Sequence, residues 1–197
     1  MRKDYEIILK LIPENSKVLD IGCSDGELIS YLENKGVSAQ GVELNQEKVI
    51  KCLEKGLDVI HGDINLIVED FPFNQFDYCL LTQTIQAVQK PDKLLNTLKK
   101  VSKNIIVSFN NSARLSKISN FLLSGSFDSL LKKADSDHWY NTDYIHPCSI
   151  KDFKKLAVNL DLKIISTFDV INQRKFENGK IPSNLFCKEV LFHITDE

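Results

Sequence analysis

Hydrophobic and polar positions alternate along the chain in two periods, one typical of helices and the other of buried strands. The first segment has the helical spacing, with apolar side chains at Tyr5, Ile8, Leu9 and Ile12, and Pro13 ends it. A short apolar run at residues 17–21 follows and predicts a buried strand. The chain therefore begins with a helix that leads directly into the first strand of a sheet.

The same alternation runs through the rest of the chain. Further strands are expected at 39–44, 57–60, 76–81 and 104–109, and helices around 28–32, over 48–55, from Pro91, over 113–123 and from Ser149. The segment Ser149–Asp152 resembles a capping box, in which Asp takes the place of the commoner Glu. Strands that alternate with helices imply parallel βαβ units wound in the right-handed sense.

The end of the chain departs from this pattern. Two strands are expected at 163–171 and 185–195, and the polar loop 172–184 joins them without a helix. Such a pair predicts an antiparallel hairpin at one edge of a mostly parallel sheet. The sequence thus predicts an α/β fold with a Rossmann-like, seven-stranded, mostly parallel sheet, in a single domain that spans residues 1–197.

Length, composition and charge restrict the class of protein. The chain has 197 residues, of which 43% are apolar and 26% charged, and a net charge of −2, so no basic field indicates a nucleic-acid partner. Its first residues are charged where a signal peptide would be apolar, and no apolar run approaches the roughly 20 residues of a membrane span. The five cysteines form no CxxC pair, which argues against a zinc ribbon or a disulfide scaffold. We expect a cytoplasmic protein.

The loop after the first strand carries the strongest functional signal. A strand that ends in a glycine turn and enters a helix presents free backbone N–H groups to a ligand. A dinucleotide fingerprint would need glycine at 22, 24 and 27, and only Gly22 fits; the Lys-Ser/Thr of a P-loop is also missing. The spacing of Asp20, Gly22 and Gly26 is instead the form found in methyltransferases that use S-adenosylmethionine (SAM). Ser24 narrows the approach to the loop, although its hydroxyl is also a possible helix cap.

Three further side chains are expected to belong to the SAM-binding site. Glu43 ends the second strand, where an acid would accept hydrogen bonds from both ribose hydroxyls, and Asp63 follows the third strand, where it would accept from the adenine amino group. Each acid alone is also compatible with a solvated residue or a helix cap, and another Rossmann-like ligand remains an alternative. Gln83, after the fourth strand, completes the expected cofactor site.

Beyond the loop, the chain resembles the methionine-biosynthesis protein W (MetW) family of class I methyltransferase-like proteins. The resemblance rests on segments spread over most of the chain, namely 18–28, 56–64, 76–78, 82–86, 106–109, 139–142, 145–146 and 149–153. It implies a SAM cofactor, a link to methionine synthesis and an association with homoserine O-acyltransferase. The chain departs from the family at Ser24, where the family has glycine, and at Asn110, where the family has proline.

The reacting groups are expected beyond the carboxyl ends of the strands, near Gln83 and Asn110, under a roof formed by the long irregular segment 124–148. His146 is the candidate general base by residue type, and a histidine that only binds loop backbone is the alternative. Trp139 and Tyr140 would form an acceptor pocket or anchor the roof to the core. His138 and His146 have no third partner at a metal-binding spacing, so no metal is expected.

Two functions remain open on the sequence. The first is a SAM-dependent methyltransferase that acts on a small molecule, since no Asn/Asp-Pro-Pro-Tyr motif for a base or glutamine amide follows the fourth strand. The alternative is a non-catalytic, SAM-binding regulatory partner of homoserine O-acyltransferase. Ser24 and the lack of an evident base favour this alternative mildly.

Overall fold

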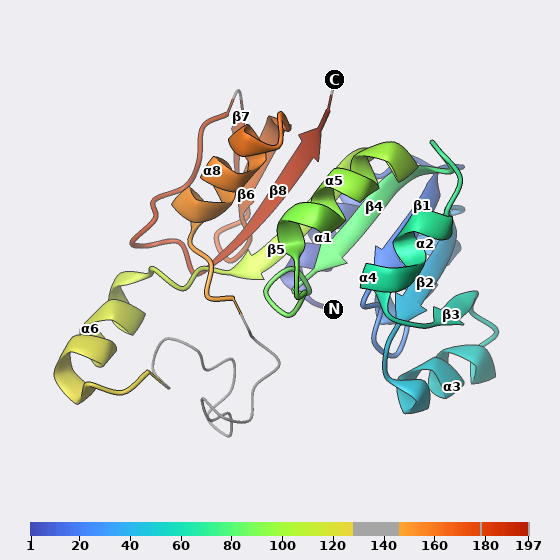
Figure 1. Ribbon diagram of the computed structural model, residues 1–197, viewed down its shortest axis with the longest axis horizontal. Helices are drawn as coiled ribbons and strands as arrows, with labels where there is room; N and C mark the ends of the chain where they lie inside the picture. Colours follow the sequence, from blue (N-terminus) through green and yellow to red (C-terminus); the bar gives the residue numbers. More distant parts are fainter. Residues whose placement is uncertain (128–145, 178, 197) are drawn as a thin grey trace.

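The computed structural model describes residues 1–127, 146–177 and 179–196. One mixed sheet has the strand order β3-β2-β1-β4-β5-β8-β6-β7 (Figure 1). The strands are β1 (Lys17–Ile21), β2 (Ser38–Glu43), β3 (Val59–His61), β4 (Phe76–Thr82), β5 (Ser102–Asn110), β6 (Lys163–Asp169), β7 (Arg174–Glu177) and β8 (Glu189–Thr195). The helices are α1 (Lys3–Leu11), α2 (Glu27–Asn34), α3 (Gln46–Glu54), α4 (Ile64–Ile67), α5 (Pro91–Val101), α6 (Leu115–Ser124) and α8 (Ile150–Asn159), with a 3-10 turn at Val68–Asp70.

The centre of the sheet confirms the parallel arrangement, and its C-terminal end corrects two expectations. Strands β1 to β5 pair in parallel, whereas β8 is antiparallel to both β5 and β6 and lies between them. The two expected C-terminal strands, β6 and β8, are therefore antiparallel as predicted, but they do not form the edge of the sheet. The sheet has eight strands rather than seven, because β7 forms inside the expected loop and occupies the edge beside β6. The sequence of β7, Arg-Lys-Phe-Glu, is mostly exposed, so it lacks the apolar period that predicts a strand.

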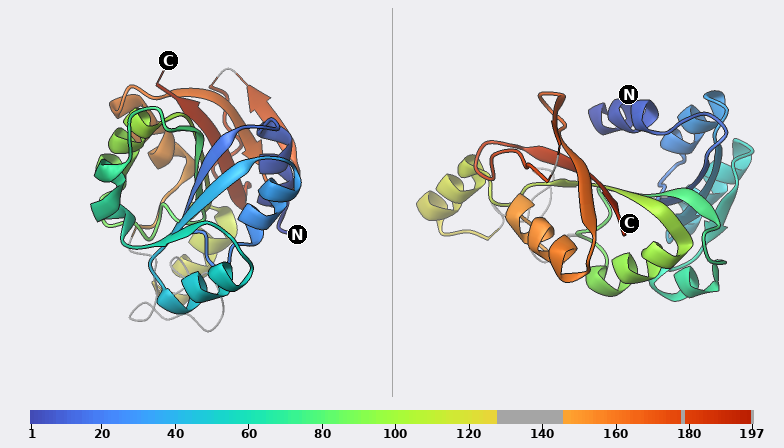
Figure 2. Two further views of the ribbon diagram at one scale, coloured as in Figure 1. Left: turned by 90° about the vertical axis from the view of Figure 1, so that its right-hand side faces the viewer. Right: turned by 90° about the horizontal axis from the view of Figure 1, so that it is seen from above.

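Helices cover both faces of the sheet (Figure 2). On one face, α1, α2 and α3 pack their apolar side chains on Val18, Leu80, Ile106 and Leu191. On the other face, α4, α5 and α8 pack on Leu19, Cys79, Val107 and Phe192. Successive strand residues point to opposite faces, so Asp20, Ser108 and Glu189 lie on the α1 face, in line with Val18, Ile106 and Leu191. Three polar side chains are therefore directed toward α1 at the carboxyl edge of β1 and β5.

Local capping explains where two helices begin. The expected capping box at α8 is confirmed: Ser149 Oγ accepts from the backbone N–H of Asp152 at 3.1 Å, and Asp152 Oδ2 accepts from that of Ser149 at 3.1 Å. The short helix α4 was not expected. It begins at Asp63, whose side chain accepts a hydrogen bond from the backbone N–H of Asn65 and so caps the helix. A helix of four residues is too short to show an apolar period in the sequence.

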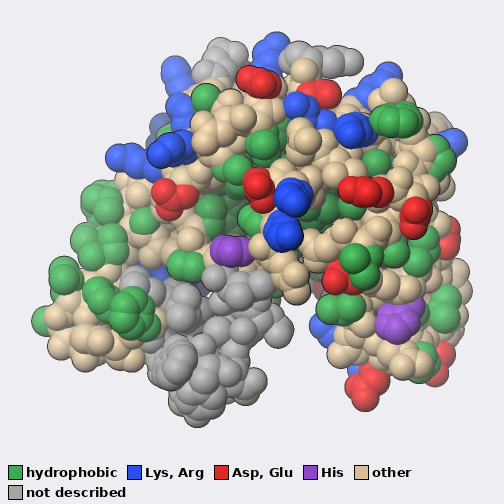
Figure 3. All heavy atoms as spheres, in the orientation of Figure 1, with side chains coloured by type: hydrophobic (Ala, Val, Ile, Leu, Met, Phe, Trp, Pro, Cys, Tyr) green, Lys and Arg blue, Asp and Glu red, His purple; other side chains and the backbone are tan. Residues whose placement is uncertain are grey.

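Helix α6 differs from the others because it extends away from the body of the molecule (Figures 1 and 3). None of its residues, all of which the structure describes, is buried. Leu122 and Leu123 are 75% and 87% exposed, and Phe127 just beyond the helix is 63% exposed. Within the described part of the chain, every helix is too short or too polar to cross a membrane.

Candidate functional site

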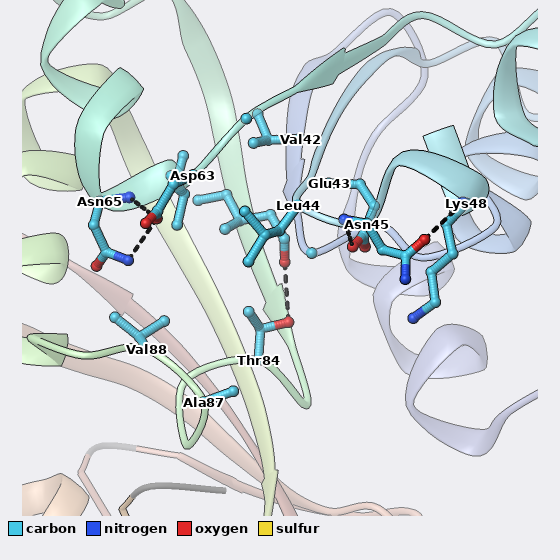
Figure 4. A pocket seen from close by; sticks show the side chains of 14 residues that line it. Val42, Glu43, Leu44, Asn45, Lys48, Asp63, Asn65, Thr84, Ala87 and Val88 are labelled. Carbon is cyan, nitrogen blue, oxygen red and sulfur yellow. Dashed lines mark hydrogen bonds between the residues drawn. The ribbon is translucent and has the colours of Figure 1, made fainter. Parts of the chain in front are cut away.

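A cavity of about 550 Å³ opens at the carboxyl edge of the sheet, where β1, β2, β3 and β4 end. Parallel strands of open α/β sheets bring their ligand-binding loops together at this edge. Asp63 and Asn65 lie on one side of the cavity and Glu43, Asn45 and Lys48 on the other, with Leu44 between them (Figure 4). Leu44 is 67% exposed and adds an apolar contact surface.

The turn after β1 brings backbone close to this cavity. Gly22 has a φ of +74°, and a Cβ at this position would lie 2.7 Å from Thr84 Oγ1. Thr84 in turn donates a hydrogen bond to the carbonyl of Ile21 at 3.0 Å, which joins the segment after β4 to the turn. Both the positive φ and the close approach require glycine at 22. The expected role of Gly22 in the loop thus has a geometric basis.

Ser24 also adopts a left-handed backbone conformation, with a φ of +54°. Its N–H donates to Glu43 Oε2 at 2.8 Å, and its carbonyl accepts from Cys52 Sγ at 3.3 Å. The N-cap position of α2 is occupied by Gly26, and no side chain caps this helix. The Ser24 hydroxyl is therefore not its cap. The left-handed conformation explains why glycine is the better residue at position 24.

Replacing Ser24 with glycine is therefore expected to stabilise the protein. A left-handed non-glycine residue costs about 1–2 kcal/mol, and the extra entropy of unfolded glycine offsets about 0.5–1 kcal/mol of that gain. Ser24→Gly should raise the melting temperature by a few degrees in calorimetry and keep or improve SAM affinity. The control is Ser116→Gly in the exposed helix α6, which should lower stability by about 0.5 kcal/mol. A large loss of SAM affinity in Ser24→Gly would make the serine hydroxyl a ligand contact.

Glu43 is buried at the end of β2, with 8% of its surface exposed. One carboxylate oxygen accepts from the N–H of Ser24 at 2.8 Å, and the other accepts from the N–H of Asn45 at 2.9 Å. The carboxylate therefore links the glycine loop to the start of α3 while it lines the cavity. Each oxygen has a second lone pair for a ligand hydroxyl.

Asp63 lines the opposite side of the cavity and caps α4. Its Oδ1 accepts from the backbone N–H of Asn65 at 2.9 Å and from the Asn65 side chain at 2.7 Å. Its Oδ2 has no hydrogen-bond partner among the described residues and is able to accept from a ligand amino group. The helix-cap alternative and the ligand role are compatible, because they use different oxygen atoms.

Asp20, near the end of β1 and just before the glycine turn, is buried, with 1% of its surface exposed, and is not among the residues that line the cavity. Its Oδ1 is buried and has no hydrogen-bond partner among the described residues. Burial raises the pKa of this carboxyl group to about 7; the charges of Asp4 and Glu43 add to the shift, and that of Arg2 opposes it. A buried carboxyl oxygen without a partner indicates a place for a hydrogen-bond donor or a positive charge.

A second group of polar side chains lies at the ends of β4, β5 and β8. The Gln83 amide donates to Glu189 Oε1 at 2.8 Å and accepts from the Asn110 amide at 2.9 Å. Gln83 has a φ of +60°, a strained conformation that is common at functional sites. Burial raises the pKa of the Glu189 carboxyl group, and the negative charge of Asp4 adds to this shift. The positive charge of Arg2 lowers the pKa but does not cancel the shift. This acidic group faces the edge where a methyl acceptor was expected.

His146 is exposed and is held by the backbone of the loop after β4. Its backbone N–H donates to the carbonyl of Gln86 at 3.0 Å, and its ring Nε2 lies 3.2 Å from the carbonyl oxygen of Gln89. It does not line the cavity. These contacts favour the alternative in which the histidine binds loop backbone. Trp139, Tyr140 and His138 lie outside the described residues.

The sequence missed the residues that α1 and β8 bring to this edge, namely Arg2, Asp4 and Glu189. Arg2 forms an ion pair with Asp4, and Ser108 at the end of β5 donates to Asp4 Oδ2 at 3.0 Å. Neither the first residues nor Glu189 belongs to a motif. Only the insertion of β8 beside β5 places Glu189 opposite Asn110. The pattern Arg-x-Asp at the start of the first helix, where Arg2 is the N-cap and Asp4 lies in the first turn, was the one available signal, and it is a weak one.

Comparison of the fold with solved structures finds methyltransferases. A SAM-dependent methyltransferase from Methanosarcina mazei matches with a TM-score of 0.70 at 15% identity, over 96% of each chain. A magnesium protoporphyrin IX methyltransferase from Synechocystis, solved with bound S-adenosylhomocysteine (SAH), matches with a TM-score of 0.68 at 13% identity, over 99% of this chain and 83% of the other. These likenesses show that the fold is that of class I SAM-dependent methyltransferases.

Sequence comparison identifies the family. A curated relative from Rhodopirellula baltica, described as a bifunctional methionine biosynthesis protein MetXA/MetW, is 31% identical over 202 residues. The match covers 96% of this chain and 32% of the relative, so the chain spans about a third of the relative's length. The model of the family described as methionine biosynthesis protein MetW matches residues 2–194. The chain belongs to the MetW family.

Proposed function

We propose that this protein binds SAM at the carboxyl edge of its sheet and transfers the methyl group to a small molecule in methionine metabolism. The observation that carries the proposal is the cavity between Gly22, Glu43 and Asp63. A glycine turn admits the cofactor close to the backbone, and the carboxylate of Glu43 is suited to a ribose diol. Asp63 Oδ2 is suited to the adenine amino group, and Leu44 to the face of its ring.

The buried carboxyl group of Asp20 supplies an independent test of fit. SAM carries an ammonium group and a sulfonium centre, and both are positive. A buried carboxyl oxygen without a partner is stabilised by a cationic donor, so Asp20 Oδ1 fits the ammonium group better than it fits a neutral ligand. The residues present therefore fit this cofactor.

The acceptor would bind where β4, β5 and β8 end. When bound, SAM supplies an activated methyl group, and the protein must hold a nucleophile in line with it and exclude water. Gln83 and Asn110, which are hydrogen-bonded to each other and, through Gln83, to Glu189, would orient the acceptor, and Glu189 would take a proton from it. Glu189 thus replaces His146 as the better candidate for general base, because its pKa is raised and it belongs to this polar group.

Calorimetric titration with SAM and SAH tests the proposal, followed by a screen of small amines, thiols, alcohols and carboxylic acids for methyl transfer. We expect both cofactor forms to bind, and at least one acceptor class to release SAH. Failure of both SAM and SAH to bind would refute the proposal. Binding of SAM with no turnover on any acceptor would favour the second candidate function.

That second candidate is a regulatory partner of homoserine O-acyltransferase, and one observation favours it. The relative from Rhodopirellula baltica is a single protein described as bifunctional MetXA/MetW, in which the part similar to this chain is joined to a second activity. Two activities in one chain suggest that their separate counterparts associate. The exposed apolar side chains Leu122, Leu123 and Phe127 on and beyond α6 provide a surface of the kind found at protein interfaces.

A binding experiment separates this candidate from a solitary enzyme. Purified homoserine O-acyltransferase from the same cell should retain the wild-type protein on a column, and the double change Leu122→Ser and Leu123→Ser should reduce that retention strongly. The control changes two other exposed leucines, Leu53→Ser and Leu66→Ser, which are 56% and 74% exposed on other helices and should not matter. Absence of wild-type retention, with and without SAM, would argue against the partnership.

A further inference from the structure

The start of α1 crosses the carboxyl edge of the sheet above three polar strand residues. Asp20 of β1, Ser108 of β5 and Glu189 of β8 all point to the α1 face at this edge. Asp4, in the first turn of α1, accepts a hydrogen bond from Ser108 Oγ at 3.0 Å. The helix is therefore attached to the sheet at the place where the glycine turn begins.

Arg2 brings a positive charge into this group. Its Nε and Nη2 atoms donate to the two oxygens of Asp4 at 3.1 Å and 2.5 Å, and its Nη1 donates to the hydroxyl of Tyr5 at 3.1 Å. These bonds use three of its five N–H groups, so, among the described residues, two are left for a ligand. Asp4 is 1% exposed, whereas the Arg2 side chain remains 39% exposed. The guanidinium is held in place by a buried partner and is still open on one side.

The charges of this group are unbalanced in a way that suggests a ligand. Asp4, Asp20 and Glu189 are three carboxyl groups near the guanidinium of Arg2, and Lys188 adds a further positive charge at Glu189 alone. Asp20 Oδ1 is buried and has no hydrogen-bond partner in the part of the chain that the structure describes. A ligand group that carries a positive and a negative charge a few ångströms apart would satisfy both the free carboxyl oxygen and the free guanidinium N–H groups. An α-amino acid has this arrangement of ammonium and carboxylate.

We propose that Arg2 and Asp4, together with Asp20, form the subsite for the α-amino-acid end of the cofactor. Asp20 accepts from the ammonium group, and Arg2 donates to the carboxylate. Asp4 holds the guanidinium in the required orientation and is itself held by Ser108. The subsite rests on the proposed binding of SAM, and it extends the cofactor site from the strand ends onto helix α1.

The group has charged and titratable neighbours on every element packed around Asp20. Arg2 and Asp4 come from the start of α1, Tyr5 from its first turn, Cys23 from the glycine loop and Glu43 from β2. Burial raises the pKa of the Tyr5 hydroxyl and of the Cys23 thiol, so both are neutral near pH 7. Arg2 is the cation of this group that remains available for a ligand carboxylate.

Two probes that differ only at the amino-acid end test the subsite by binding alone. SAH carries the amino acid, and 5′-methylthioadenosine keeps the adenine, the ribose and the thioether but lacks it. Isothermal titration of the full chain should show that Arg2→Gln weakens SAH binding by roughly 10- to 100-fold, the loss expected for a charge-assisted hydrogen-bonded pair. Binding of 5′-methylthioadenosine should change by less than about twofold, because it does not reach Arg2.

Two further variants separate ligand contact from damage to the fold. The double change Arg2→Gln and Asp4→Asn removes the ion pair without leaving a buried carboxylate unpaired, and it should show the same selective loss of SAH. The control is Lys3→Gln, which removes the cation next to Arg2 in the sequence. Lys3 does not belong to the proposed subsite, and its Nζ donates to the carbonyl of Ile171 at 2.8 Å. It should bind both probes as the wild type does.

The outcomes distinguish this inference from the proposed function. Equal losses for SAH and 5′-methylthioadenosine, or no loss for either, would overturn the subsite while SAM binding stands. If the wild-type protein binds neither probe, the proposed function fails and the subsite fails with it. A selective loss for SAH in both Arg2 variants, with Lys3→Gln unchanged, would establish the subsite.

Discussion

Changing Asp20 to asparagine is expected to stabilise the ligand-free protein at pH 8 and, at the same time, to weaken its binding of SAM. The carboxyl group is fully buried, and its pKa is raised to about 7, from an ordinary value near 4. The folded protein therefore holds a proton that the unfolded chain has released between about pH 4 and pH 7. The free energy of unfolding falls as the pH rises through this window and remains low above it.

The size of this effect follows from the shift. Three pKa units correspond to about 4 kcal/mol, so Asp20→Asn should gain roughly 2–4 kcal/mol at pH 8 and much less at pH 5. Urea denaturation at the two pH values measures it. The control is Asp25→Asn, an exposed acid in the same loop, which should have little effect at either pH. A gain that is the same at pH 5 and pH 8 would show that Asp20 is not the group that titrates.

The same carboxyl group links cofactor affinity to pH. An ammonium group beside Asp20 favours its ionised form, so binding of SAM should release a proton near neutral pH. We expect the affinity of the wild-type protein for SAM to rise between pH 6 and pH 8, and that of Asp20→Asn to be weaker and nearly constant. Calorimetry in buffers with different ionisation enthalpies measures the released proton directly. No proton release across this range would argue against contact between Asp20 and the ammonium group.

Glu43→Ala is expected to weaken SAM binding by roughly 1–3 kcal/mol, a loss of about 5- to 150-fold. The change removes the carboxylate that faces the cavity, and it also releases the N–H groups of Ser24 and Asn45, which hold the glycine loop against α3. Calorimetric titration measures the affinity. The control is Glu47→Ala, which removes an exposed acid from the first turn of α3 and should leave the affinity unchanged.

The ribose contact is separated from the loop contact by a change in the ligand. Adenosine and 2′,3′-dideoxyadenosine differ only in the diol that Glu43 is proposed to bind. The wild-type protein should prefer adenosine, and Glu43→Ala should bind both equally, because the preference depends on the carboxylate. A preference that persists in Glu43→Ala, or an affinity for SAM that equals that of the parent, would remove Glu43 from the ribose site.

The sequence predicted well those features that depend on short stretches of chain. The period of apolar residues located α1, β1 and the βαβ units that follow, because burial of one helix face or one strand imposes a local repeat. The capping box at Ser149 and Asp152 was predicted for the same reason, since both partners lie within one turn. Gly22, Glu43 and Asp63 line one cavity, because each ends or follows a strand and parallel strands end at one edge; their role as cofactor ligands stays a prediction.

Other features depend on contacts between distant parts of the chain, and only the tertiary structure decided them. Strand β7 escaped prediction because an exposed, charged edge strand has no apolar period. The position of β8 between β5 and β6 could not be predicted, because the local sequence does not show which strands will pair. This pairing brings Glu189 beside Asn110. Arg2 and Asp4 meet Ser108, about a hundred residues away in the chain, only because α1 packs across the sheet. By itself the sequence determined most of the helices and strands and the glycine turn after β1, because these arise from neighbouring residues. The charged group formed by Arg2, Asp4, Asp20 and Glu189 exists only once folding has brought α1, β1, β5 and β8 together.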